Sequence, residues 1–200
     1  MPHCCRTRVR GVRGWSARIS GWGAKVVVPD RFGDSRGWFC ETWNRQRLLG
    51  LDIDIEFVQD NQSYSRDTGT VRGLHYQSPP FAQDKLVRVI HGRILDVVVD
   101  VRRGSPTYGR WASAELSAEN GRQLLAPIGF LHGFVTLEPD TEVVYKVSNY
   151  YSRECDGGVL WNDPDLAIDW GIPADAAQLS DKDARAPRFV DFASPFVWEE

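Results

Sequence analysis

The spacing of apolar segments is the feature of this sequence that most constrains its fold. From Lys25 onward, short runs rich in Val, Ile, Phe and Tyr alternate with groups of Gly, Pro, Asn and Asp, as in KLVRVIHG and RILDVVVDVR. Many short strands at regular spacing are typical of antiparallel sandwiches and jelly rolls. We therefore expect an all-β jelly roll (an antiparallel β-sandwich or barrel) with a few short helices. One helix is expected in WNRQRLLGL, where Trp43, Leu48 and Leu49 share a face before Gly50.

The chain is expected to divide into an N-terminal extension and a single domain. Residues 1–24 are rich in arginine, contain no acidic residue and lack the apolar stretch of a secretory signal. Because no hydrophobic period connects them to a core, we expect them to form a loose basic extension. Residues 25–200 contain no repeat, linker or low-complexity tract. We therefore assign them to one jelly-roll domain.

Charge and composition exclude several classes of partner. The formal net charge is -3, so no strong overall field attracts nucleic acid or an acidic membrane. No apolar run approaches the length of a transmembrane helix. The cysteines, at positions 4, 5, 40 and 155, fit neither a zinc spacing nor a small disulfide framework. We expect a cytoplasmic protein with reduced thiols that binds neither nucleic acid nor membrane.

The histidines argue against a metal site. They are His3, His75, His91 and His132. A metal-binding jelly roll requires His-x-His with a nearby carboxylate on one strand and a further histidine later, so that three or four ligands converge. Here His75 is followed by Tyr76 and Gln77, and no second histidine lies within ligand spacing. We therefore expect no metal. His91 precedes Gly92 at a turn and is given no role.

Acid–base chemistry without a metal is the alternative for His75. A neutral imidazole with a carboxylate behind it is a competent base near neutral pH. Arg72 lies three residues before His75, and Lys85 follows a loop with two prolines. Cations beside a base suit a reaction that forms an anion such as an enolate, or a substrate that carries phosphates. Taken alone, each cation is more often an ordinary surface charge.

Nine sequence blocks together resemble a known family. In chain order they are FGDSRGWFCE, QDNQSYS, VRGLHYQ, AQDKLVRV, GRILDVVVDVRRGSPTYGRW, APIGFLHGF, VVYKVSNYYS, GGVLWNDP and LSDKD. Their order and spacing resemble those of the dTDP-4-dehydrorhamnose 3,5-epimerase family, from about Val26 to Arg188. A single HYQ motif would be weak evidence, but nine linked blocks are strong evidence.

The resemblance implies a fold, a reaction and a mode of assembly. The fold is a cupin-like jelly roll that forms a homodimer and needs neither a metal nor an organic cofactor. The substrate is a dTDP-4-keto-6-deoxyhexose. The reaction is epimerisation of dTDP-4-dehydro-6-deoxyglucose at C3, C5 or both, by loss and return of a proton next to the C4 ketone. The product is dTDP-4-dehydrorhamnose, in deoxysugar biosynthesis.

The resemblance also assigns three catalytic residues. His75 is implied as the general base, Asp183 as its carboxylate partner, and Tyr145 as the proton donor on the other face of the sugar. Physical chemistry agrees, because inversion removes a proton from one face and returns one to the opposite face, which two groups do more simply than one. A tyrosine with an ordinary pKa of about 10 is protonated and ready to donate.

A larger set of residues is implied to bind the substrate. It comprises Arg36, Glu41, Gln59, Asp60, Asn61, Arg72, Lys85, His132, Asp156 and Lys182. Arg36 and Glu41 resemble nucleotide contacts and are expected to serve the partner's site in a swapped dimer. Asp156 stands where the resemblance leads us to expect a glutamate, which keeps the charge but changes the reach. Tyr150, Tyr151 and Trp161 are candidates for stacking on the thymine or the sugar.

Three other functions are weighed against this one. The first is a monofunctional 3- or 5-epimerase of another deoxysugar pathway, with the same catalytic residues. The second is a metal-dependent cupin enzyme, which the missing His-x-His disfavours. The third is a non-catalytic jelly roll that binds a sugar nucleotide. Because His75, Tyr145 and Asp183 are all present, catalysis is favoured over binding alone.

Overall fold

The structure is a computed structural model that describes residues 8–9, 15–19 and 23–199. The described strands are β1 (Arg8–Val9), β2 (Trp15–Ile19), β3 (Lys25–Pro29), β4 (Arg31–Asp34), β5 (Gly37–Cys40), β6 (Gln59–Ser65), β7 (Val71–Gln77), β8 (Lys85–His91), β9 (Arg93–Asp100), β10 (Trp111–Ser117), β11 (Gln123–Ala126), β12 (Phe130–Thr136), β13 (Thr141–Val147) and β14 (Asp156–Gly158). The described helices are α1 (Arg45–Leu49), α2 (Asp181–Ala184) and the short 3-10 helices η1 (Ala174–Ala176) and η2 (Phe189–Asp191).

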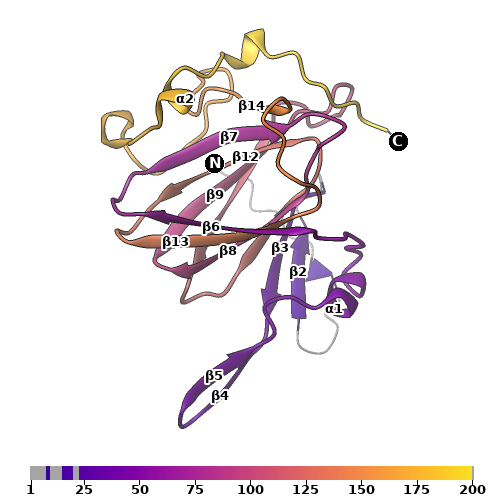
Figure 1. Ribbon diagram of the computed structural model, residues 1–200, viewed down its shortest axis with the longest axis vertical. Helices are drawn as coiled ribbons and strands as arrows, with labels where there is room; N and C mark the ends of the chain where they lie inside the picture. Colours follow the sequence, from indigo (N-terminus) through magenta and orange to yellow (C-terminus); the bar gives the residue numbers. More distant parts are fainter. Residues whose placement is uncertain (1–7, 10–14, 20–22, 200) are drawn as a thin grey trace.

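Two antiparallel sheets packed face to face form the body of the protein (Figure 1). The larger sheet has the strand order β1-β2-β3-β11-β8-β13-β6, and the smaller has the order β10-β9-β12-β7-β14. A separate hairpin consists of β4 and β5. This arrangement confirms the predicted all-β jelly roll with short helices. In the described part of the chain, no helix is long and apolar enough to cross a membrane.

Strand alternation decides which side chains face the space between the sheets. Phe134 of β12 packs there against Val87 of β8 and Val98 of β9. Leu131 and Val135, which lie at the alternate positions of β12, pack instead on the outer face of the five-stranded sheet. Because successive side chains of a strand point to opposite faces, every second residue of the central strands faces the inside of the jelly roll. Polar residues at these inner positions are therefore gathered into one interior site.

The C-terminal part of the chain covers the outer face of the five-stranded sheet (Figure 1). Trp161, Trp170 and Phe196 pack there against Leu74 and Leu131. The Trp170 indole N–H donates to the Trp161 carbonyl at 2.8 Å, so the ring is satisfied although it is buried. This cover brings α2 over β7, and the site depends on that placement.

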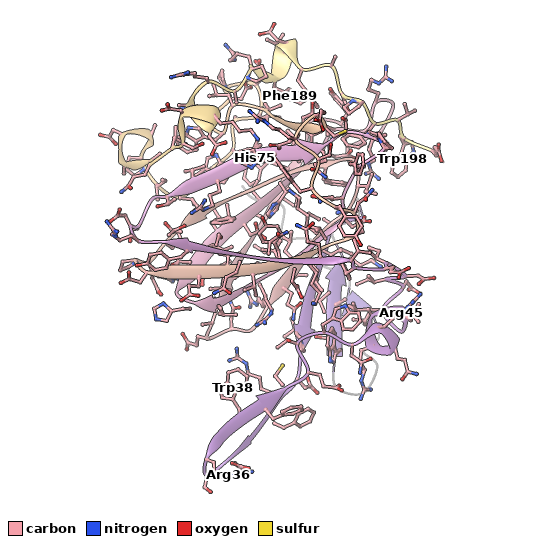
Figure 2. All side chains as sticks on the ribbon, viewed as in Figure 1. Arg36, Trp38, Arg45, His75, Phe189 and Trp198 are labelled. Atoms are coloured by element: carbon pink, nitrogen blue, oxygen red, sulfur yellow. The ribbon has the colours of Figure 1, made fainter. Side chains whose placement is uncertain are left out.

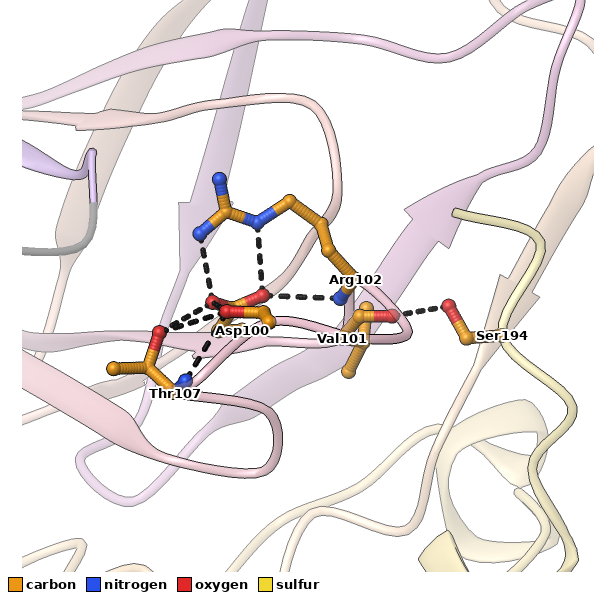
Figure 3. Close-up of polar contacts among 6 residues, drawn as sticks. Asp100, Val101, Arg102, Thr107 and Ser194 are labelled. Atoms are coloured by element: carbon orange, nitrogen blue, oxygen red, sulfur yellow. Dashed lines mark hydrogen bonds and ion pairs between the residues drawn. The ribbon is translucent and has the colours of Figure 1, made fainter. Parts of the chain in front are cut away.

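A buried carboxylate orders the turn at the end of β9, to which this cover is attached (Figure 3). Asp100 accepts hydrogen bonds from Arg102, at 2.7 and 2.9 Å, and from the hydroxyls of Ser105 and Thr107. Burial opposes ionisation, but these hydrogen bonds hold the pKa of the Asp100 carboxyl below its ordinary value. The next residue accepts at its carbonyl from the hydroxyl of Ser194, so the cover is tied directly to β9.

The prediction of a loose extension over residues 1–24 is wrong for residues 15–19. There β2 pairs with β3 in a continuous register, and the side chains of Trp15 and Ala17 are buried. The alternation of Trp15, Ser16 and Ala17 is a strand pattern, but it is too short to stand out from an arginine-rich segment. Ala24 is also buried. Residues 1–7, 10–14 and 20–22 lie outside the described residues.

The helix predicted near residue 45 is present, but its predicted apolar face is wrong. Only Leu48 is buried in α1, whereas Leu49 and Trp43 are exposed. The reason is that Trp43 precedes the cap residue Asn44, whose side chain accepts from the Arg47 amide at 3.2 Å. A helix that begins after Trp43 cannot bring it onto one face with Leu48.

The hairpin of β4 and β5 extends away from the body of the protein (Figure 1). Its aromatic side chains are largely exposed: Phe32 by 59%, Trp38 by 60% and Phe39 by 65%. At its base, Arg31 donates to the carbonyls of Ala118 and Glu119. Large apolar side chains gathered on a projecting element are typical of an interaction surface.

Candidate active site

His75 lies on the inner face of the five-stranded sheet, where two strands approach closely. On β7 it is the register partner of His132 on β12. Two positions earlier, a Cβ atom at Gly73 would lie 2.5 Å from the Cα atom of Gly133, so only glycine permits this approach. The close approach of β7 and β12 therefore brings His75 and His132 side by side inside the jelly roll.

Asp183 reaches His75 from α2. The Nε2 atom of His75 lies 2.5 Å from the Oδ1 atom of Asp183, and the carboxylate is almost fully buried. Burial alone would raise the pKa of the Asp183 carboxyl, but hydrogen bonds from His75 and Ser180 hold that pKa below its ordinary value. An ionised acceptor fixes the proton on Nε2, which leaves Nδ1 of His75 with its lone pair. The predicted base and its partner are thus in contact.

Tyr145 stands on the inner face of the opposite sheet. It lies on β13 and packs with the apolar residues between the sheets, and it is the register partner of Asn61 on β6. Burial raises the pKa of the Tyr145 phenol above its ordinary value, although the nearby Arg72 guanidinium opposes the shift. The phenol therefore keeps its proton at neutral pH and can donate it.

Lys85 and Arg72 provide positive charge inside the site. Burial lowers the pKa of the Lys85 ammonium to about 8, and the carboxylates of Asp156 and Asp96 oppose this shift. A small pocket between the sheets is lined by Lys85 and His132, among others. Arg72 donates to the Ser65 hydroxyl at 3.2 Å and to a backbone carbonyl at 2.9 Å, which orients its guanidinium along β6.

Asp96 is a site residue that sequence reasoning missed. It lies on β9, is completely buried, and places Oδ1 2.6 Å from Nε2 of His132. Its Oδ2 atom has no hydrogen-bond partner among the described residues. The available signal was a carboxylate within the apolar run RILDVVVDVR. A buried acid in such a strand needs a polar partner, and His132 is that partner.

The side chains of Gln59, Asp60 and Asn61 do not all lie on the same face of β6. Gln59 and Asn61 turn inward and are joined by a hydrogen bond of 2.8 Å, and the Gln59 side chain also accepts from the Tyr151 amide. Asp60 turns outward and pairs with Lys146 at 2.7 Å. Because side chains alternate along a strand, one chain cannot bring all three residues to the same pocket.

Arg36 and Glu41 do not meet the other candidates within one chain. Arg36 lies at the tip of the hairpin, at the end of the molecule opposite His75 (Figure 2), and pairs with Asp34 at 2.6 Å. Glu41 follows the hairpin and accepts from Asn44 at 3.2 Å. Arg36 belongs to the projecting hairpin and Glu41 to the segment between that hairpin and α1, so neither residue lies in the interior site.

Asp156 and Lys182 lie at the rim of the site and contact each other. The Lys182 ammonium is 2.5 Å from Oδ2 of Asp156, and the Tyr151 hydroxyl donates to the same oxygen at 3.2 Å. Tyr150 and Tyr151 are exposed there and available for stacking, whereas Trp161 is a core residue.

The last observations concern His91, possible metal ligands and the reaction that the interior groups can support. His91 is the exposed last residue of β8, where its Nδ1 donates to the Asp140 carbonyl at 2.7 Å. Among the described residues, no group of three or more His, Cys, Asp or Glu side chains is placed to hold a metal ion. The interior instead combines a histidine on one sheet, a protonated tyrosine on the other, and a partly buried ammonium. Such a set can remove a proton next to a carbonyl group, stabilise the enolate and return a proton.

Comparison with known proteins identifies the family. A family model for dTDP-4-dehydrorhamnose 3,5-epimerase matches residues 19–191. The enzyme of that name from Sinorhizobium fredii is 49% identical over 174 residues, which are 87% of this chain and 89% of that protein. The crystal structure of the Bacillus anthracis enzyme, with TDP and PPi bound, is 49% identical with a TM-score of 0.85, and the match covers 88% of this chain and 99% of that one.

A third match is a dTDP-6-deoxy-D-glucose-3,5-epimerase from Legionella pneumophila in complex with dTDP-4-keto-L-rhamnose. It is 39% identical with a TM-score of 0.88, and the match covers 93% of this chain and all of that one (100%). The matches agree in fold over almost the entire described chain. This chain is therefore an isomerase that belongs to the dTDP-4-dehydrorhamnose 3,5-epimerase family.

Proposed function

We propose that this isomerase inverts C3 and C5 of dTDP-4-dehydro-6-deoxyglucose, without a metal or an organic cofactor, and so forms dTDP-4-dehydrorhamnose. The observation that carries the proposal is the placement of the His75–Asp183 pair on one sheet and of Tyr145 on the other. A sugar bound between the sheets has one face toward a base and the other toward an acid. Inversion at a carbon next to a ketone needs this arrangement.

Each inversion then proceeds in two proton transfers. Nδ1 of His75 removes the proton from the carbon next to the C4 ketone, and the electron pair of the C–H bond moves onto the C4 oxygen. Asp183 stabilises the imidazolium that results, because it already accepts from Nε2. The Tyr145 phenol then returns a proton to the opposite face of the same carbon. Solvent restores the proton to the tyrosine and takes the one from the histidine.

The other inner residues bind the substrate in this proposal. The Lys85 ammonium stabilises the enolate oxygen, with His132 beside it in the pocket. Arg72 faces the phosphates, and Gln59 and Asn61 line the wall made by β6. The TDP bound to the Bacillus anthracis relative supports a nucleotide diphosphate as the ligand. We also propose that the enzyme acts in the cytoplasm.

A homodimer completes the site in this proposal. Arg36 and Glu41 lie on or next to a projecting aromatic hairpin and cannot reach the interior site of their own chain. A second copy that receives the hairpin would bury Trp38 and Phe39 and bring these two charges to its own nucleotide. The exposure of those two rings supports this mode of assembly.

Deuterium incorporation tests the proposed reaction. The substrate is incubated with the enzyme in deuterated buffer containing EDTA, and proton NMR follows each ring position. Deuterium at both C3 and C5, together with inverted product, is expected. Deuterium at one carbon only would instead identify a monofunctional epimerase. Loss of activity in EDTA that a divalent ion restores would favour the metal-dependent alternative.

Substitution of His75 tests the assignment of the base. His75→Ala should lower kcat by about 10²–10⁴-fold, the usual loss when a general base is removed. His91→Ala removes an exposed histidine that bonds only a backbone carbonyl in the described structure, and it should leave the rate unchanged. A His75→Ala enzyme that epimerises near the wild-type rate would show that another residue is the base.

A further inference from the structure

The last described residues of the chain form a tail that packs against the segment after β9. This C-terminal tail, residues 192–199, follows η2 and lies beyond residues 19–191, which the family model matches. The Ser194 hydroxyl donates to the Val101 carbonyl (Figure 3), and the Phe196 amide donates to the same hydroxyl at 3.2 Å. The tail is therefore fixed to the fold immediately before Phe196.

Further contacts hold the tail immediately after Phe196. The Arg103 amide donates to the Phe196 carbonyl at 3.0 Å, and the Trp198 amide donates to the Arg103 carbonyl at 2.9 Å. The Arg102 guanidinium lies over the ring of Trp198 at 4.2 Å and over the ring of Phe130 at 4.6 Å. A cation placed over an aromatic face is attracted to it. The position of Phe196 is thus fixed from both sides along the chain.

Phe196 lines the pocket that contains Lys85. Phe196 is buried, and its ring centroid lies 6.0 Å from that of Tyr76. Lys85, His132 and Phe130 line the same pocket, whose volume of about 10 Å³ is at the lower limit for a single water molecule. A ring from the tail therefore forms part of the wall beside the cation and leaves little room for water.

We propose that Phe196 is a positioning residue that closes the pocket beside Lys85 to water, and that the C-terminal tail holds it there. The inference rests on the proposed function, in which the Lys85 ammonium stabilises the enolate. A cation acts more strongly on a developing anion where water is excluded, because water no longer screens the two charges. The Phe196 side chain has no polar group, so it acts on the reaction through the surroundings of Lys85.

The charges around Lys85 come from elements other than the tail. Burial, the largest effect, lowers the pKa of the Lys85 ammonium to about 8. Asp156 of β14 and Asp96 of β9 act to raise this pKa, and Lys182 of α2 acts to lower it. His132 of β12 lines the same pocket. Because removal of an aromatic ring changes none of these charges, a change in the Lys85 pKa would report the entry of water.

The test compares Phe196→Ala with Phe192→Ala. Both rings belong to the tail and contact Tyr76, but Phe192 is not among the described residues that line the pocket, so it is the matched control. In substrate-free protein with ¹³C-labelled lysine, NMR measures the pKa of Lys85, whose signal is identified by its loss in Lys85→Met. In Phe196→Ala this pKa should rise by about one pH unit or more, because water reaches the ammonium. In the control it should equal the wild-type value.

Two further variants separate closure of the pocket from folding. Phe196→Leu keeps an apolar side chain of similar reach, so the Lys85 pKa should stay close to the wild-type value. Phe196→Val keeps only part of the apolar volume and should give a smaller rise in the same direction, which provides the measurement if Phe196→Ala does not fold. A lowered melting temperature with an unchanged Lys85 pKa would overturn the proposal in favour of a packing role. An equal rise of the pKa in Phe192→Ala would also overturn it.

Kinetics connect the closed pocket to the reaction. In Phe196→Ala, kcat should fall by about tenfold, because a hydrated ammonium stabilises the enolate less. The fall of kcat at alkaline pH should move to higher pH together with the Lys85 pKa, since the ammonium then persists to higher pH. The NMR measurement uses no substrate, so it remains valid if the proposed reaction is wrong. A raised Lys85 pKa with unchanged kcat would support the closed pocket and contradict the proposed role of Lys85.

Discussion

At the scale of single residues, the surroundings of each titratable side chain determine whether it is protonated. The Tyr145 phenol is buried, which raises its pKa and keeps it protonated, whereas hydrogen bonds keep Asp183 ionised despite burial. His75, Tyr145 and Asp183 could be proposed as a catalytic set from the sequence because each lies in a distinctive sequence block. Asp96 could not, because nothing in an apolar strand indicates which face an acid occupies or which histidine it meets.

Tyr145→Phe should separate deprotonation from inversion. Phenylalanine keeps the ring and removes only the hydroxyl, so the packing between the sheets is retained. His75 can still remove the proton, and the enolate then recovers it mainly from the original face. We expect deuterium exchange into unchanged substrate while inverted product falls sharply, both followed by NMR. Inversion at the wild-type rate would mean that a different group donates to the second face.

Lys85 should give the reaction an alkaline limit. Burial lowers its pKa to about 8, so the ammonium that we propose stabilises the enolate is lost as the pH rises through that value. We expect kcat to fall above about pH 8 in the wild type. Lys85→Arg should move this fall to higher pH, because arginine stays charged. Lys85→Met should lower kcat by about 10²–10³-fold at every pH.

Lys25→Met is the matched control for this profile. Burial lowers the pKa of the Lys25 ammonium as well, but Lys25 donates to the backbone carbonyls of Leu51 and Asp52, away from the site. In Lys25→Met, the fall in kcat at alkaline pH should match that of the wild type. If Lys85→Arg also shows an unchanged fall, another group sets the alkaline limit.

At the scale of strands and helices, the pleat determines which predicted residues act together. Arg72 and His75 of β7 both lie on the inner face although they are three residues apart, because the pairing of β7 with β12 shifts register between them. Tyr145 of β13 lies on the inner face of the other sheet. Regular alternation along β6 turns Asp60 outward, although its neighbours Gln59 and Asn61 turn inward. Sequence reasoning grouped these three because they are adjacent, and adjacency in a strand means opposite faces.

The strand β2 should contribute measurably to stability, contrary to the expectation for a loose extension. Trp15 is buried against Leu48 and Leu86, so Trp15→Ala should lower the free energy of unfolding by about 3–5 kcal/mol. Ser16→Ala, on the alternate face of the same strand, should change it by less than about 0.5 kcal/mol. Urea unfolding measures both. A Trp15→Ala protein as stable as the wild type would restore the view of a dispensable N-terminal segment.

At the scale of the whole molecule, two stacked sheets provide the opposed faces that inversion requires. The interior of the jelly roll contains the proposed base, acid and cation, and the C-terminal cover brings Asp183, the proposed partner of the base, from outside (Figure 1). The overall fold was predictable because strand spacing alone indicates a two-layer all-β protein. The projection of the β4–β5 hairpin was not predictable, because no local sequence pattern shows that its aromatic side chains have no surface to cover in their own chain.

The hairpin should control the oligomeric state. Trp38→Ser and Phe39→Ser remove exposed aromatic rings, and each should weaken the dimer by about 30-fold or more, as expected for an interface residue that contributes about 2 kcal/mol. Sedimentation velocity over a range of concentrations measures the shift. Val190→Ser, which removes an exposed apolar side chain on η2, should leave the dimer intact. A wild-type protein that is monomeric at micromolar concentration would contradict the proposed assembly.

The placement of α2 has a consequence for the order in which a newly made chain becomes active. His75 precedes its partner Asp183 by 108 residues. At the usual pace of synthesis, about 5–20 residues per second, the ribosome needs roughly 5–20 s to proceed from one to the other. β7, β9 and β12 are complete well before α2 emerges. The nascent jelly roll can therefore close around a His75 without its partner, and the proposed base gains its carboxylate only when synthesis is nearly finished.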